Sequence, residues 1–163
     1  MPPRSEQPLL PSVLDRLLDD DPDVSREAPR SRDQVLRDIK ESVRRDIENL
    51  LNTRRRLFTW PSEMRELDRS MVGYGIPDLA AGALGSDEAR DRFCRMLQTM
   101  LRQYEPRFKS IEVRPLANAE PLDRTLRFRI DALLRVDPAP EPVAFDSMLE
   151  PGAGGFAVSG VRG

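Results

Sequence analysis

The sequence of 163 residues contains no histidine, one cysteine, one tryptophan and two tyrosines. The absence of histidine excludes Ser-His-Asp and Cys-His catalysis, zinc sites with histidine ligands and a histidine pH switch. The lone Cys94 can form neither an internal disulfide nor a thiolate metal cluster, which fits the cytosol better than an oxidising compartment. Catalysis would have to use carboxylates, Lys, Tyr, Ser or Cys94, and we expect no metal and no cofactor.

The sequence also lacks an excess of one charge sign and a long apolar run. Its 26 Lys and Arg residues nearly balance 28 Asp and Glu residues, for a net charge of -2, so no basic field attracts nucleic acid. No uncharged run reaches the about 20 apolar residues that cross a bilayer. The N-terminus has two prolines before any apolar run and does not read as a signal peptide. We expect a soluble protein with no nucleic-acid partner and no membrane insertion.

Length and composition predict one domain with a modest core. Residues 1–11 hold four of the 15 prolines and little to bury, so we expect a flexible arm there. The predicted domain covers residues 12–159, and residues 160–163 form a tail.

Apolar residues recur at helical spacing in the first two thirds of the chain. The pattern predicts a short helix that begins at Ser12 and stops at Pro22, followed by helices over residues 31–51, 62–72 and 86–104. Ser86 is the expected N-cap of the last helix.

From residue 108 the apolar period changes to two. The alternation predicts strands over residues 108–114, 126–136, 143–148 and 156–159, with a proline connector at 138–142 and a glycine turn at 152–155. The predicted fold class is α+β, with N-terminal amphipathic helices packed on a C-terminal antiparallel β-meander.

Two candidate ligand-binding loops do not match their motifs, and the carboxylates alone do not identify a catalytic site. The acidic residues 19–23 lack the central Gly and the final Glu of a calcium loop, and the glycines at 152–155 lack the Lys and Ser or Thr of a phosphate loop. Among 28 carboxylates some pair always lies at the separation of a glycosidase site. Composition therefore neither excludes nor supports a sugar hydrolase.

The most informative local feature is Glu105-Pro106-Arg107, where the last helix meets the first strand. Pro106 cannot continue a helix and biases Glu105 toward an extended conformation, which puts Glu105 and Arg107 on the same side. The pair is either an exposed salt bridge worth about 0 to 1 kcal/mol or a surface for a partner. Spacing alone leaves both interpretations open.

Five segments, taken in order, resemble the TssE family of type VI secretion baseplate subunits, part of a phage-tail wedge family once labelled lysozyme-like. The segments are residues 11–17, 45–54, 74–78, 105–107 and 145–150. The resemblance implies a non-enzymatic structural protein of a contractile injection machine, in the cytoplasm at the inner-membrane-docked baseplate. It also implies contacts with other wedge subunits, initiation of sheath polymerisation, and an assembly role for Glu105, Pro106 and Arg107.

Two other functions stay open beside this one. A peptidoglycan glycosidase using paired carboxylates is the main alternative, and a helical interaction module with a basic face is a weaker one.

The open meander also predicts how a sheath subunit would bind to this chain. Its edge strand carries unpaired main-chain groups that accept a strand from another chain. We expect the last strand to contribute directly or by supporting the edge, with Phe156 and Val158 setting the register. On this view, removal of residues 151–163 leaves the helical half folded.

Overall fold

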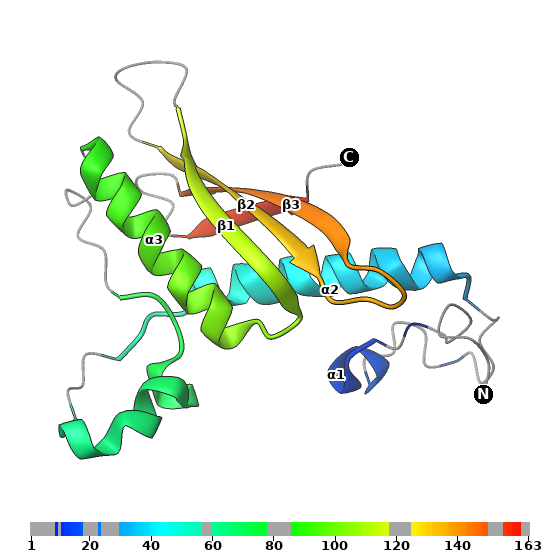
Figure 1. Ribbon diagram of the computed structural model, residues 1–163, viewed down its shortest axis with the longest axis horizontal. Coiled ribbons are helices and arrows are strands. Elements are labelled where there is room, and N and C mark those ends of the chain that lie inside the picture. The colour runs from blue at the N-terminus through cyan, green and yellow to red at the C-terminus, as the bar shows by residue number, and fades with distance from the viewer. Residues whose placement is uncertain are drawn as a thin grey trace.

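The computed structural model describes residues 9, 11–17, 23, 30–56, 60–77, 86–117, 125–149 and 155–160 (Figure 1). The acidic residues 19–21, the turn residues 152–154, the tail residues 161–163 and most of the proline-rich arm lie outside this described part. The helical elements are α1 (Val13–Leu17), α2 (Arg32–Asn52), η2 (Ser62–Arg69), η3 (Met71–Gly73) and α3 (Asp87–Tyr104). The strands are β1 (Phe108–Leu116), β2 (Leu126–Leu134), β3 (Glu141–Leu149) and β4 (Phe156–Gly160).

The two long helices begin where their capping residues predict. The Ser31 side chain accepts from the backbone of Gln34, and the Gln34 side chain accepts from the backbone of Ser31, which forms a capping box for α2. The Ser86 side chain accepts a hydrogen bond from Ala89 N at the start of α3. The predictions for these two helices are confirmed.

The strands form one antiparallel sheet in the order β1-β2-β3-β4. α3 packs beside β1 and α2 packs against β4, so the two helices flank the sheet (Figure 1). This arrangement confirms the predicted α+β class with a C-terminal meander. β3 begins at Glu141, so Pro142 belongs to the strand and not to the connector, and β2 ends two residues earlier than expected, at Leu134.

The hydrophobic core joins both helices to the sheet. One ring from each of α3, β2 and β4 meets there: Phe93, Phe128 and Phe156 have centroids 6.0 to 6.2 Å apart. The stripe of α2 contributes Val43, Ile47, Leu50 and Leu51. The last strand is therefore part of the same core as the helices.

The segment predicted as a helix over residues 62–72 is instead two 3-10 turns. Its apolar residues Met64, Met71 and Val72 are exposed, so no apolar face is buried that would stabilise a longer α-helix. The Tyr104 hydroxyl donates to Asp68 O at 3.0 Å and fixes the segment beside the end of α3. Gly75 has φ +104°, a conformation that favours glycine, and it allows the bridge between Arg54 and Ile76.

No helix within the described ranges is both long and apolar enough to span a bilayer.

Candidate interaction site

The candidate site is built around the turn that joins α3 to β1. Arg107 donates from Nε to Glu105 Oε1 at 2.6 Å, and its NH2 group binds Glu105 Oε2. The Arg107 backbone N–H also donates to Glu105 Oε1, at 3.2 Å. Of the two interpretations that the spacing left open, the structure shows the two side chains paired with each other.

The prediction that this pair is exposed is wrong. The Glu105 side chain is 8% exposed and the Arg107 side chain 27%. The turn lies against α2, where Arg107 NH2 donates to Asp46 Oδ2 at 2.5 Å and NH1 donates to Ser42 Oγ at 3.1 Å. Burial by itself lowers the pKa of Arg107, but the carboxylates of Glu105 and Asp46 outweigh it and raise that pKa above its ordinary value.

The same network extends to α1. The Ser42 hydroxyl lies 2.9 and 2.8 Å from the two carboxylate oxygens of Asp15, and Arg45 NH2 donates to Asp15 Oδ1 at 2.7 Å. The Ser12 hydroxyl donates to Asp15 Oδ2 at 2.6 Å. We call the connected side chains of Asp15, Ser42, Arg45, Asp46, Glu105 and Arg107 the Arg107 cluster. The cluster joins α1, α2 and the α3–β1 turn.

The outer edge of β4 is covered by α2. Asn52 Nδ2 donates to Phe156 O at 2.9 Å, and Phe156 N donates to Asn52 Oδ1 at 2.7 Å. Arg44 NH1 donates to Val158 O at 3.0 Å, and Val158 N donates to Glu48 Oε1 at 3.3 Å. All four main-chain groups that these two residues direct away from β3 therefore have partners on α2.

This arrangement changes what was expected of Phe156 and Val158. Both side chains are buried in the core, and their outward main-chain groups are already bonded. They stabilise the fold in this structure, and a strand added at β4 would have to displace α2 contacts.

The other edge is partly covered by α3. Val113 N donates to Gln98 Oε1 at 3.0 Å, and Arg102 NH2 donates to Ile111 O at 3.2 Å. Pro115, two residues further along, has no N–H to offer an added strand. Helix side chains thus contact both edge strands.

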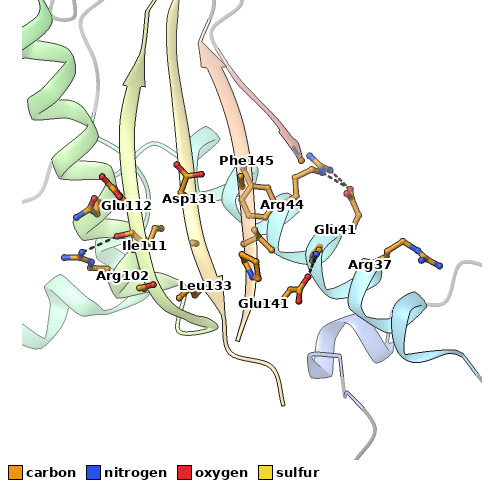
Figure 2. Close-up of a pocket in the computed structure, with 18 residues that line it drawn as sticks. Arg37, Glu41, Arg44, Arg102, Ile111, Glu112, Asp131, Leu133, Glu141 and Phe145 are labelled. Atoms are coloured by element: carbon orange, nitrogen blue, oxygen red, sulfur yellow. Dashed lines mark hydrogen bonds and ion pairs between the residues drawn. The ribbon is translucent and has the colours of Figure 1, made fainter. Parts of the chain in front are cut away.

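A hollow of about 1200 Å³ opens between the helices and the sheet (Figure 2). Two cations at its rim are paired within the chain: Lys40 Nζ lies 2.9 Å from Glu141 Oε1, and Arg44 NH2 lies 2.8 Å from Glu41 Oε1. These contacts hold the carboxylates of Glu141 and Glu41 in ion pairs within the chain.

The described residues support neither a reactive Cys94 thiolate nor a metal site. Burial, with a contribution from Asp91, raises the pKa of Cys94 to about 11, so the reactive thiolate is disfavoured. Among the residues that the structure describes, no three His, Cys, Asp or Glu side chains gather as a metal site.

Sequence reasoning missed the α2 and α1 members of the cluster. Ser42 and Asp46 are one helical turn apart beside the apolar stripe of α2, and this spacing was the available signal. Asp15 gave no signal, because its partners lie 27 and 30 residues away.

A protein-family profile described as "Baseplate wedge protein gp25" matches residues 37–139. The matched part runs from α2 to the end of the β2–β3 connection and includes Glu105, Pro106 and Arg107, whereas α1, β3 and β4 lie outside it. A search of curated proteins found no match.

Proposed function

The chain belongs to the family of baseplate wedge protein gp25, and we propose that it is the TssE-type subunit of a type VI secretion baseplate. The family supports a structural role in a phage-tail-like baseplate and contacts with other baseplate subunits. The finer assignment rests on the five sequence segments that resemble TssE. In this role the chain performs no turnover and needs no cofactor, nucleic acid or membrane insertion, and it works in the cytoplasm at the inner-membrane-docked baseplate.

The observation that carries the proposal is the position of the Glu-Pro-Arg turn within the matched region. Glu105 is buried, Arg107 is partly exposed and Pro106 is exposed. We propose that Pro106 and the accessible edge of Arg107 contact another wedge subunit, while Glu105 holds Arg107 in place. Charged and rigid groups of this kind fix the register of an interface.

Sheath initiation is the second part of the proposal. Strand addition remains the proposed route, with Phe156 and Val158 supporting the sheet from the core and not contacting the added strand directly. β1 has two such contacts, from Gln98 and Arg102, whereas β4 has four, so fewer hydrogen bonds would have to break at β1. We therefore place the accepting edge at β1.

Copurification tests the wedge assignment. The tagged chain, isolated from its own cells, is expected to bring the other wedge subunits with it. Pro106→Asp should reduce their recovery at least about fivefold, because it adds a charge to the proposed contact without touching the core. Pro140→Asp, at an exposed proline of the β2–β3 connection, serves as the matched control and should not change recovery. Equal recovery with both variants contradicts a contact at Pro106.

The glycosidase alternative has a direct assay. The purified chain is expected to release no reducing sugar from peptidoglycan above a heat-inactivated control. Hydrolysis that disappears on substitution of one Asp or Glu contradicts the structural assignment.

A further inference from the structure

The α1 helix is attached to α2 by the carboxylate of Asp15 and not by buried apolar side chains. It has five residues, none of them buried. Val13, Leu14 and Leu17 are 65%, 59% and 75% exposed, so they give α1 no apolar attachment. The contact of α1 with the rest of the chain runs through Asp15, whose side chain is 15% exposed.

Ser42 and Arg107, beside which the Asp15 carboxylate binds, are held in place by contacts that do not involve Asp15. Ser42 is buried on the rigid helix α2, and Arg107 beside it is held by Glu105 and Asp46. Arg107 donates to the Ser42 oxygen, so the single hydroxyl proton of Ser42 is directed toward Asp15. Arg45 adds a second donor and is 41% exposed, so it is free to turn toward a new anion.

We propose that Ser42 and Arg45, backed by Arg107, form a binding site for a carboxylate, and that Asp15 is an internal occupant which an acidic side chain of a partner baseplate subunit replaces. The identity of the partner as a baseplate subunit rests on the proposed function, whereas the carboxylate site itself does not. The exchange keeps every hydrogen bond of the site, because one carboxylate replaces another. Little opposes the release of α1, because α1 buries no apolar side chain.

Asp15 competes as a tethered ligand, because it belongs to the same chain as Ser42 and Arg45. Removal of the competitor should therefore strengthen binding of any carboxylate at the site. The charged groups that face Asp15 are Arg45 on α2, with Asp46 and Arg107 behind Ser42.

The site can be tested with acetate as the probe and the full chain as the receptor. Amide shifts of Ser42, Arg45 and Arg107 are followed by NMR in wild type, Asp15→Ala and Asp15→Asn, with sodium chloride at equal ionic strength as the control. We expect saturable shifts in both variants and at least about tenfold weaker binding in wild type. Arg45→Ala combined with Asp15→Ala should abolish saturation. Equal titration of wild type and variants, or no saturation in either variant, overturns the proposal.

A second arm uses the wedge subunits that copurify with the chain. Asp15→Asn should bind them at least about fivefold more tightly than wild type, because the internal competitor is gone. Weaker binding would show that α1 itself contacts the partner, and would overturn replacement of Asp15. If no variant binds the wedge subunits while acetate still titrates as expected, the proposed function fails and the carboxylate site stands.

Discussion

Arg107 holds together parts of the fold, in addition to the assembly role that we propose for it. Its guanidinium bonds Glu105 on its own turn and Asp46 and Ser42 on α2. The i, i+2 spacing of Glu105 and Arg107 predicted that they would lie on the same side, because that geometry is local. Their burial could not be predicted, because it depends on α2, which lies about sixty residues earlier in the chain.

At this scale we predict that Arg107→Ala destabilises the chain by about 3 kcal/mol, because it leaves the buried Glu105 carboxylate without its cation. This replaces the expected cost of at most about 1 kcal/mol that an exposed pair would give. Chemical denaturation measures the effect. Arg114→Ala, which removes an exposed ion pair with Asp131, is the control and should cost at most about 1 kcal/mol. Equal losses in the two variants would contradict a buried role for Arg107.

At the scale of elements, α2 covers the outer edge of β4. Its side chains bond the main-chain groups that a further strand would otherwise bond. The predicted strand over residues 156–159 is confirmed, but periodicity cannot show that a helix 100 residues earlier covers its edge. We predict that Asn52→Ala costs about 1 to 3 kcal/mol, because Phe156 N and O both lose their partner. Amide exchange at residues 156–158 should accelerate. Asn49→Ala, at an exposed position of the same helix, should leave exchange unchanged, and protection of Phe156 in both variants would contradict the edge contact.

We predict that the contact of α1 with α2 weakens as the pH falls. Burial raises the pKa of Asp15, but hydrogen bonds from Ser12, Ser42 and Arg45 outweigh it and hold that pKa below its usual value. The contact is therefore at full strength above the unfolded pKa of about 4, and is lost as pH falls through the lower pKa of the folded chain. The protection factors of the amides of residues 13–17, corrected for the intrinsic exchange rate at each pH, should fall between pH 5 and about pH 2 in wild type, while those of Asp15→Asn are low at both. Loss of protection between pH 6 and 8 in wild type would contradict this assignment.

At the scale of the whole molecule, the sequence predicted the architecture well because both periodicities are strong. The two long helices and the four strands all appear, with ends that differ by a few residues. The exception is the segment over residues 62–72, where four apolar residues suggested a helix that has little to pack against. The site was predicted only at its local turn, since the remaining members come together through tertiary contacts.

The shared core argues against the expectation that the helical half folds without the last strand, which stays to be tested. Phe156 packs against Phe93 of α3 and Phe128 of β2, and Asn52 of α2 bonds its main chain. We predict that removal of residues 151–163 yields a chain without a cooperative thermal transition, and that Phe156→Ala alone costs about 3 to 5 kcal/mol. Circular dichroism melting measures both. A truncated chain that melts as sharply as the full one would contradict a core that depends on β4.

The chain belongs to a baseplate wedge family, and we propose that a contractile sheath starts from it. The most direct measurement counts fluorescent sheath foci in cells that lack the chain and in the same cells supplied with it again. We predict that foci are absent without the chain and return to wild-type frequency with it. Foci at wild-type frequency in cells that lack the chain would contradict the claim.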